Sequence, residues 1–451
     1  MISQIVRKMK NYLIICVFVV LGLRVAAQSE QEHLVEEQPL SALIEQALEQ
    51  NPTVRMVRNR WQQADNNHSL QPFLPSVGGT ARYNKSQTDS KRIFNEQEQD
   101  FSNTTSENLS AGVSLSWTLF DGLGMFANYR RSAYQLDAAE LETRRVVEQL
   151  VGDLADLYFR IVVQQHRLEA AEQLMDLSRE RFRIITEQVN IGTASGMDLQ
   201  QARLDLNADS SLLVRQKEAL QGAYIQMNQL MNQPLKNHGF VGDTILLGAP
   251  LVEDDLLLMA LENNVNLVAN ELGMAITEQE LRLAQARRYP NINFVSGYTY
   301  SRAETPASVI TFNESQGFNY GLEASLNIFN GFEVNRNVRN ARIELENRRL
   351  SYEETELAVK GQLHTLYNTY LNNLMMVDFE KQNVEVARAN LDLALERYEL
   401  GVLSGLGFRE FQLGYINAVD RSLESMYQSK VLELSLLVLS GQMEEFMGRI
   451  R

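Results

Sequence analysis

The feature that most constrains this chain is an internal repeat with an offset of 209 residues. At this offset, residues 117–122 (WTLFDG) match residues 326–331 (LNIFNG), and residues 192–196 (GTASG) match residues 401–405 (GVLSG). A constant offset over about 75 residues means that two segments carry the same elements in the same order and with the same lengths. The 451 residues therefore predict one structural unit used twice, in place of two or three unrelated domains.

Each repeat is expected to begin with a pair of β-strands. In residues 109–119, and again in residues 318–328, apolar side chains alternate with small or polar ones, which is typical of a strand with one apolar face. Prolines 75 and 290, related by an offset of 215, precede the first strand of each pair. The pattern fits a half-buried sheet of a soluble domain or a lipid-facing barrel wall around a wet lumen. The predicted strands are residues 74–85, 107–120, 290–301 and 317–329, and the polar residues 86–106 and 302–316 between partners are expected to be exposed loops.

A long apolar seam with a period of 3.5 residues follows each strand pair. Alternate steps of four and three residues from Tyr129 to Val189 meet fourteen apolar side chains at eighteen positions, and the equivalent steps from Val338 to Tyr398 meet thirteen. Such a seam predicts helices that pack side by side as in a coiled coil, each about 100 Å long. Glycine-containing turns then reverse the chain. Long helical hairpins are thus predicted at residues 123–232 and 332–441.

The segments outside the hairpins are assigned from their composition. Residues 1–27 contain basic residues, then an apolar run, then small residues, which is the order of a cleavable signal peptide. Its removal would change the net charge from −15 to −19 and would take away the only cysteine, Cys16. The predicted order is a signal peptide 1–27, a flexible segment 28–39, a first repeat 40–232 that opens with a helix, an equatorial connector 233–262, a second repeat 263–441 that also opens with a helix, and a C-terminal tail 442–451.

Composition and motifs exclude several classes of function. An acidic chain whose only basic cluster is N-terminal is a poor nucleic-acid binder, and a single cysteine excludes a disulfide within the chain and a cysteine-based metal site. Residues 122–127 (GLGMFA) fit a dinucleotide-binding fingerprint, but the strand before them alternates and the predicted helix is too long for that fold. The five histidines lack metal-ligand spacing, and no G-x-S-x-G motif occurs. We therefore expect no enzyme activity, no cofactor and no metal site.

An exported protein with this sequence can cross a membrane only through its strands. Residues 28–451 contain no run of 18 apolar residues, which a spanning helix requires. Strands in lipid must close into a barrel, because unpaired edges are prohibitive there. Four strands cannot close alone, eight strands from two chains are filled by side chains, and three or more chains leave a passage. The architecture predicts an oligomeric conduit with a helical tube below the barrel.

These features, in this order, resemble the TolC-like outer-membrane efflux protein family. The likeness rests on the tandem repeat, on Phe-Asx-Gly at residues 120–122 and 329–331, and on a glycine turn followed by serine at each hairpin tip. It implies an α+β, mostly α fold, with four strands per protomer in a shared 12-stranded trimeric β-barrel continued by a periplasmic α-helical barrel. It also implies a homotrimer in the outer membrane of a Gram-negative bacterium, with outer-membrane lipid, a periplasmic adaptor (membrane fusion) protein and an inner-membrane pump or transporter as partners.

The function that the resemblance implies is passive conduction. The trimer would be the channel-tunnel of a tripartite efflux system, through which small molecules pass from the periplasm to the exterior. A type I protein secretion duct is an alternative within transport. A soluble periplasmic coiled-coil adaptor or scaffold, which never enters the membrane, is the alternative from another class.

The same resemblance assigns the functional residues to the hairpin tips. Family members place two acidic residues past the second turn, where they narrow and charge the periplasmic entrance. Here Gly407 takes the first place and Glu410 the second, while the first repeat offers Asp198. A Glu410 at the surface or in an ion pair is the alternative, and the tip glycines would also serve simply to reverse the chain. The residues expected to dock the adaptor are Gly192, Thr193, Ala194, Gly401, Val402 and Leu403.

Overall fold

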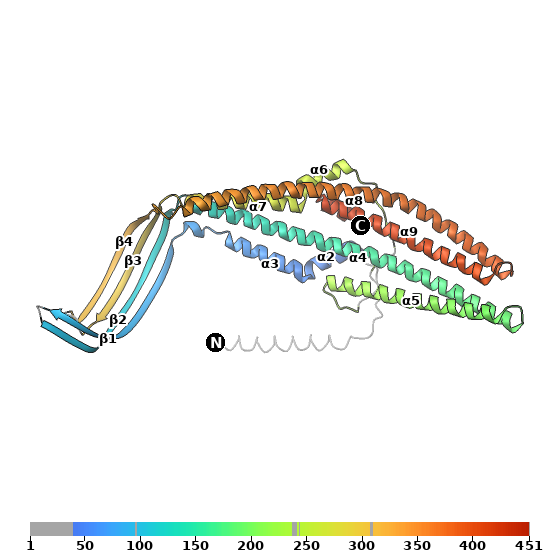
Figure 1. Cartoon of the computed structure of the whole chain (residues 1–451), viewed down its shortest axis with the longest axis horizontal. Coiled ribbons are helices and arrows are strands. Elements are labelled where there is room, and N and C mark those ends of the chain that lie inside the picture. Colours follow the sequence, from blue (N-terminus) through green and yellow to red (C-terminus); the bar gives the residue numbers. More distant parts are fainter. Residues whose placement is uncertain (1–38, 95–96, 237–240, 243, 307–309, 451) are drawn as a thin grey trace, which may run out of the picture.

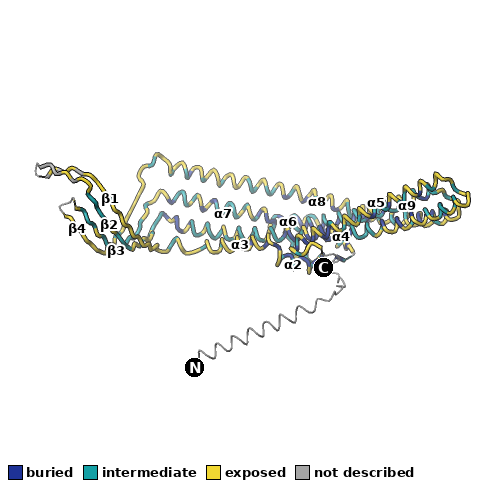
Figure 2. Tube along the Cα trace, turned by 90° about the horizontal axis from the view of Figure 1, so that it is seen from below, coloured by how far each residue is buried: buried dark blue, intermediate teal, exposed yellow. Residues whose placement is uncertain are grey.

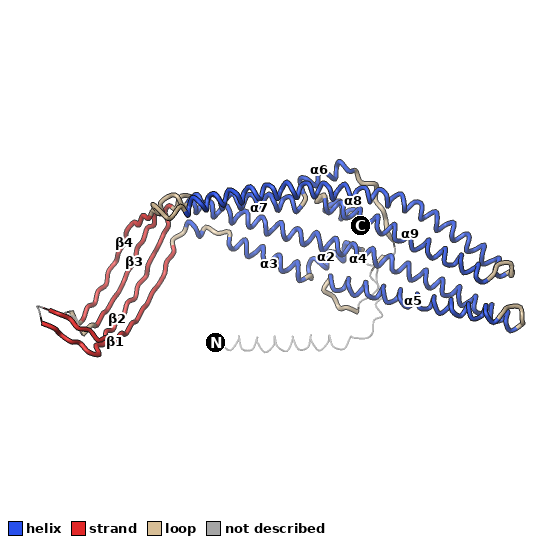
Figure 3. Tube along the Cα trace, viewed as in Figure 1, coloured by secondary structure: helices blue, strands red, loops and turns tan. Residues whose placement is uncertain are grey.

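The computed structural model describes residues 39–94, 97–236, 241–242, 244–306 and 310–450. The predicted signal peptide and nearly all of the segment 28–39 lie outside these residues. Figure 1 shows one elongated body, with a four-stranded sheet at one end and the tips of two helical hairpins at the other. The strands occupy only that end, and helices make up most of the remainder (Figure 3).

The sheet is antiparallel, and its register aligns the alternating patterns of all four strands. Its strands follow one another in chain order: β1 (Ser76–Phe94), β2 (Gln97–Phe120), β3 (Asn291–Glu304) and β4 (Phe312–Ser325). Val113, Tyr298 and Phe318 lie side by side in one row across three strands. The next row, on the opposite face, contains Ser114, Gly297 and Asn319. Since residues directly opposite one another share a face, the sheet has one apolar and aromatic face and one small, polar face.

The polar segment predicted as the first loop is almost entirely strand. β1 and β2 continue through residues 86–94 and 97–106 as a two-stranded ribbon, and Lys85 pairs with Glu107 across it at 2.6 Å. β3 and β4 likewise extend into the second predicted loop. These loop predictions were wrong because alternation reveals a strand only where one face is apolar, whereas a ribbon solvated on both faces is polar throughout.

β4 ends earlier than predicted. It stops at Ser325 in place of residue 329, and Ser325 pairs with Asn291, the first residue of β3. β3 begins directly after Pro290 and offers no backbone beyond Asn291 for further pairing. The apolar residues that follow Ser325 are therefore exposed at the edge of the sheet, and Ile328 is 91% exposed.

The two repeats contain helical hairpins of equal size. The first is formed by α4 (Gly124–Asn190) and α5 (Gly196–Leu230), and the second by α8 (Glu333–Glu399) and α9 (Gly405–Leu439). In both, the helices are 67 and 35 residues long, and 67 residues span about 100 Å. Leu154, Ile161 and Leu363, all on the predicted seam, are fully buried. The long helices thus match those that the seam predicts.

Shorter helices lie beside the hairpins, and an asparagine divides each pair of them. The side-chain oxygens of Asn51 and Asn264 accept hydrogen bonds from the first backbone N–H groups of the helix that follows. Their amide nitrogens donate to the last carbonyls of the hairpins, Asn51 to Leu230 at 2.9 Å and Asn264 to Leu439 at 2.8 Å. Equivalent bonds therefore attach the short helices in both repeats. The short helices are α2 (Leu40–Gln50), α3 (Pro52–Asn67), the 3-10 helix η1 (Gln71–Phe73), α6 (Glu253–Asn263), α7 (Val265–Ala286) and α10 (Met443–Arg449).

The main core lies in the middle of the body, where the short helices pack on the hairpins (Figure 2). Ala47 of α2 and Phe446 of α10 are completely buried there. Lys430 and Glu433 of α9 are buried as an ion pair at 3.2 Å, and Arg449 of α10 joins Glu433 at 2.5 Å. Among the helices that the structure describes, none is both long enough and apolar enough to cross a membrane.

Candidate functional site

The tips of the two hairpins share one backbone conformation. Gly192 and Gly401 follow the long helices with positive φ angles of 80° and 72°, which glycine adopts without the strain that a Cβ brings. In each tip the next residue, Thr193 or Val402, donates its backbone N–H to a carbonyl five positions earlier, at 2.8 and 2.9 Å. A Cβ on either glycine would meet no atom within 4 Å. The glycines therefore serve the turn and leave both tips open.

The return helices begin with serine caps that differ between the repeats. The Ser195 hydroxyl accepts from the Asp198 backbone N–H at 3.2 Å, and the Asp198 carboxylate accepts from the Ser195 backbone N–H at 3.1 Å and hydroxyl at 2.8 Å. These hydrogen bonds from Ser195 lower the pKa of Asp198. Ser404 accepts from the Gly407 N–H at 3.1 Å, but Gly407, the repeat equivalent of Asp198, brings no acid. Asp198 is thus both a helix cap and an exposed charge, and Glu410 is exposed on the second tip.

A groove of about 410 Å³ lies between the two tips. Its lining comes from both hairpins, so the structure brings residues more than 200 positions apart onto one surface. Gly192, Val402 and Glu410 lie outside this lining, and Val402 is 76% exposed. Five of the eight predicted functional residues line the groove: Thr193, Ala194, Asp198, Gly401 and Leu403.

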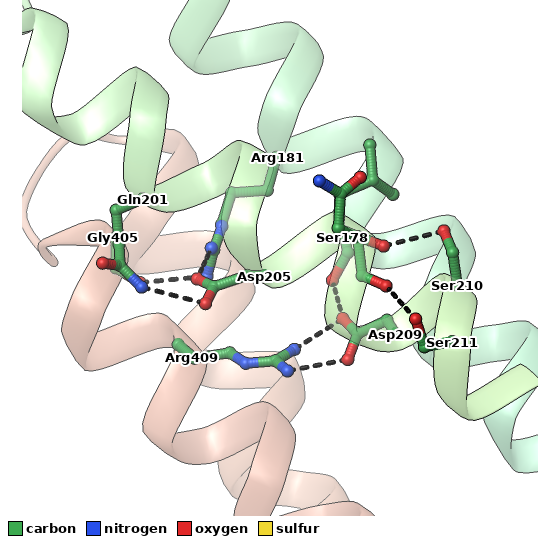
Figure 4. A network of polar contacts seen from close by, with 11 residues as sticks. Ser178, Arg181, Gln201, Asp205, Asp209, Ser210, Ser211, Gly405 and Arg409 are labelled. Atoms are coloured by element: carbon green, nitrogen blue, oxygen red, sulfur yellow. Dashed lines mark hydrogen bonds and ion pairs between the residues drawn. The ribbon is translucent and has the colours of Figure 1, made fainter.

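A polar network joins the two hairpins close to the tips (Figure 4). Asp209 of α5 accepts hydrogen bonds from both terminal nitrogens of Arg409 of α9, each at 2.7 Å. The hydroxyl of Ser178 of α4 donates to the same carboxylate at 2.6 Å. The Asp209 and Arg409 side chains are 3% and 12% exposed. A bidentate pair with so little solvent is strong and directional, and it links three helices from the two repeats.

A second buried arginine extends this network. Arg181 of α4 forms an ion pair with Asp205 of α5 and donates to the backbone carbonyl of Gly405, at the start of α9, at 3.3 Å. Gln201 donates to the other carboxylate oxygen of Asp205 at 3.0 Å. The Arg181 side chain is only 2% exposed, so these partners replace the water that its charge loses on burial. We call the set of Ser178, Arg181, Asp205, Asp209 and Arg409 the tip clamp.

An aromatic pair fixes the turn of the second hairpin. The rings of Tyr398 and Phe408 stack with centroids 5.0 Å apart and an angle of 10° between their planes. Both side chains are buried, and burial raises the pKa of Tyr398. Tyr398 is one of the residues that line the groove, but its hydroxyl oxygen is shielded from solvent and has no hydrogen-bond partner among the described residues. It is therefore a buried polar group without a partner in this arrangement of the tip.

Sequence reasoning missed the tip clamp, because the clamp does not repeat. Ala418 and Gln200 occupy the positions equivalent to Asp209 and Arg409, so the offset that reveals the scaffold gives no sign of the ion pair. One signal was present in the sequence: Ser178 is one of four polar residues on the otherwise apolar seam. A polar side chain at such a position indicates a buried polar partner.

The arrangement at the tips suits a contact between the two hairpins. Within the described part of the chain, no three histidine, cysteine or acidic side chains form a group able to hold a metal ion. The charged groups of the tip clamp are paired with one another, Asp209 with Arg409 across the two hairpins and Arg181 with Asp205 within the first hairpin. Such a site can hold the hairpins together or release them.

Known proteins share both the sequence pattern and the fold. The sequence model of the family described as outer membrane efflux protein matches residues 43–233 and 256–442. Outer membrane protein TolC of Salmonella enteritidis is 21% identical over 395 residues, which cover 84% of this chain and 76% of TolC. The cation efflux system protein CusC of Escherichia coli O157:H7 is 21% identical over 416 residues, which cover 89% and 85%.

Solved structures give the same result for the fold. The crystal structure of the Campylobacter jejuni CmeC outer membrane channel aligns with a TM-score of 0.75 at 16% identity, and the alignment covers 91% of this chain and 89% of CmeC. The predicted fold class, in which a β-hairpin and a very long α-hairpin occur twice, is thus confirmed. The chain belongs to the outer membrane efflux protein family, and it is a channel protein of the Gram-negative outer membrane, not an enzyme.

Proposed function

We propose that three copies of this chain form a channel through which small molecules pass passively from the periplasm to the exterior. The register of the sheet carries the proposal, because it gathers the apolar residues of four strands on one face and the small polar residues on the other. β1 and β4 are the edges of this sheet, and edges in lipid need partners. Three copies supply twelve strands, enough to enclose a passage lined by the polar face.

The apolar face has the height of a membrane. On β2 it runs from Leu109 to Leu119, a distance of about 34 Å along the strand. A tilt of about 40° reduces this to a height of about 26 Å, close to the apolar band of about 25 Å in outer-membrane barrels. The polar ribbon beyond Leu109 would then extend outside the membrane, which accounts for its solvated faces.

We assign the hairpin tips to a periplasmic adaptor, which would connect the channel to an inner-membrane pump. The groove between the tips supports this assignment, because Thr193, Ala194 and Gly401 leave room for a partner segment. The Tyr398 hydroxyl at the groove lacks a hydrogen-bond partner among the described residues, and an unpaired buried hydroxyl is costly. Docking that opens the groove would expose this hydroxyl, and a polar group of the adaptor segment would then satisfy it.

Opening would follow from separation of the two hairpins at the tip clamp. The clamp joins α5 to α9 and α4 to α9 near the periplasmic end, so the hairpins cannot separate there without breaking it. Asp198 and Glu410 would add exposed carboxylates near the entrance, three of each in a trimer. Rings of carboxylate in a narrow pore favour cations.

Planar lipid bilayers test conduction directly. Purified protein should insert as trimers, give stepwise currents, and migrate on gels as a band that heating converts to monomer. A protein that stays in the soluble periplasmic fraction as a monomer and gives no current would contradict the proposal.

Gly401→Asp tests docking separately, with Gly401→Asn as the matched control. Both side chains tolerate a positive φ and have nearly the same size, and the Cβ position is open. Both variants should therefore assemble into conducting trimers. The added charge should abolish export from cells with Asp and leave most of it with Asn. Normal export by both variants would contradict adaptor docking at this tip.

A further inference from the structure

Several exposed arginines lie where the helices meet the sheet, and four of them form one group. Arg130 is on α4, Arg288 is in the turn after α7, and Arg339 and Arg342 are on α8; we call them the basic patch. No carboxylate of a described residue forms an ion pair with any of the four, whereas the arginines two turns further along α8 are paired with glutamates. In a chain of net charge −15, unpaired arginines at one level of the structure give a local positive charge that suits an anionic partner.

The aromatic residues of the first repeat show which side the patch faces. Trp117, on the apolar face of β2, donates its indole N–H to the carbonyl of Phe73 at 2.9 Å. The ring of Phe73 lies 5.1 Å from that of Phe126 at the start of α4. Arg130 is four residues from Phe126, and residues four apart lie on the same face of a helix. Arg130 therefore lies on the side of the apolar face, outside the proposed barrel.

The second repeat places its arginines on the same side. Arg339 is the equivalent of Arg130 at the offset of 209, and Asn335 is the equivalent of Phe126. Arg342 is seven residues from Asn335, which again is two turns along one helix face. The two long helices thus present arginine at equivalent positions of the two repeats, and α8 adds one more.

The remaining arginine replaces an aromatic residue. Arg288 is the equivalent of Phe73 at the offset of 215 that relates the prolines before β1 and β3. It donates a hydrogen bond to Asn335 at 3.2 Å, where Phe73 packs on Phe126 in the first repeat. One position therefore holds an aromatic contact in one repeat and a cationic, polar contact in the other.

In the orientation of the proposed function, the patch lies just beyond the lipid headgroups and within reach of them for a long side chain. Arg130 and Arg339 are about 9 Å along their helices from the ends near the sheet, and the headgroup layer adds about 5 to 8 Å to each side of the hydrocarbon. Long arginine side chains extend toward such a layer. Guanidinium groups bind phosphate through two parallel hydrogen bonds, so the chemistry of the patch fits phospholipid headgroups.

We propose that the basic patch binds anionic phospholipid, such as phosphatidylglycerol, in the periplasmic leaflet of the outer membrane. This inference rests on the orientation of the sheet in the proposed function. Anionic lipid is favoured over zwitterionic lipid because its phosphate carries no cation of its own, so the arginines supply the whole countercharge. A trimer has three such patches, which alternate around the barrel with three aromatic clusters.

Lipid retention by the full-length protein tests the proposal. Trimers are reconstituted into vesicles of phosphatidylethanolamine with phosphatidylglycerol, released into detergent, and analysed by native mass spectrometry for bound lipid. The variant R130Q/R288Q/R339Q/R342Q removes the patch. The matched control R179Q/R183Q/R348Q/R349Q removes the same number of charges from arginines that are already paired with acids. Arg339→Gln alone replaces the fourfold variant if the latter fails to assemble.

Wild type and control should retain phosphatidylglycerol in preference to phosphatidylethanolamine. In the patch variant, the ratio of bound phosphatidylglycerol to bound phosphatidylethanolamine should fall about fivefold for each arginine removed, at low salt. Equal retention by the patch variant, or no preference in the wild type, overturns the proposal. Bilayer conductance separates the two hypotheses. A conducting wild-type trimer without lipid preference refutes only the lipid site, whereas a wild type that does not conduct refutes the channel itself.

Discussion

The bidentate pair between Asp209 and Arg409 offers the most direct test of the proposed opening by separation of the tips. Asp209→Asn keeps the shape of the side chain and removes its charge, so Arg409 loses its only carboxylate partner within the described structure. Breaking a buried pair in this way costs about 3–5 kcal/mol, and exposures of 3% and 12% place this pair in that class. Since about 1.4 kcal/mol is a tenfold change, the equilibrium between joined and separated tips should shift at least a hundredfold per clamp.

Single-channel recordings in planar bilayers measure this shift. Wild-type trimers should spend most of their time at low conductance, and Asp209→Asn should add frequent, long openings of higher conductance. Arg409→Gln should act in the same direction. The double variant should open little more than either single variant, because the two residues share one interaction. A double-mutant cycle of the open probabilities should therefore give a coupling energy of about 3 kcal/mol between Asp209 and Arg409.

Arg167→Gln is the control for charge loss between the hairpins. Arg167 of α4 contacts Asp420 at 2.7 Å and Glu424 at 2.9 Å on α9, but these acids are 55% and 44% exposed. An exposed ion pair stabilises a contact by about 0–1 kcal/mol, so the single-channel currents of this variant should be almost the same as those of the wild type. Equal conductance in Asp209→Asn and wild type, or equal gains in Asp209→Asn and Arg167→Gln, would refute the idea that burial makes the clamp hold the tips.

Three further predictions concern the remaining charges and caps. Asn264→Ala removes a helix cap and a bond to α9 and should destabilise the protein by about 1–2 kcal/mol in denaturant unfolding, whereas Asn263→Ala should change little. Burial raises the pKa of Tyr427 from 10.0 to about 12, so the neutral phenol stabilises the fold below pH 10, and this stability is lost as the pH rises through 12. In Tyr427→Phe, the free energy of unfolding should therefore depend less on pH between 10 and 12. A pH dependence equal to that of the wild type would exclude this contribution. Replacing Asp198 and Glu410 together by alanine should lower cation selectivity in bilayers. Unchanged reversal potentials would contradict a role for these two carboxylates at the entrance.

The scaffold could be predicted because each of its parts is encoded locally. A seam of period 3.5 specifies a long packed helix, and its two copies predict helices that the structure extends to 67 residues each. Gly192 and Gly401 mark turns that only a positive φ allows. The strands were predictable in residues 76–85, 107–120, 291–301 and 317–325, where apolar and polar side chains alternate or follow a proline. The solvated ribbon of residues 86–94 and 97–106 was not, because polar side chains on both faces leave no period.

The site could be predicted only in part, for a related reason. Tip residues follow from the position of the turns, and the roles assigned to them remain predictions. The pair of Asp209 and Arg409 joins side chains 200 residues apart, on helices whose rotation about their own axes no local pattern specifies. The cap of Ser195 and Asp198 was not predicted, although serine followed three residues later by an acid before a helix is the sequence signal of a capping box.

The differences between the repeats, more than their likeness, support the proposed role of the tip clamp. A glycine turn is required wherever a hairpin reverses, so Gly192 and Gly401 are both kept. An acid in the coiled-coil interior has no such structural need. The equivalent of Asp209 in the second repeat is Ala418, which is buried and uncharged. Because a buried acid is costly unless it is paired, its presence in only one repeat requires a specific partner, and that partner belongs to the other hairpin. An interaction of this kind opposes relative movement of the two hairpins and not movement of the pair as a unit. The tip should therefore open by separation of unlike hairpins within each protomer.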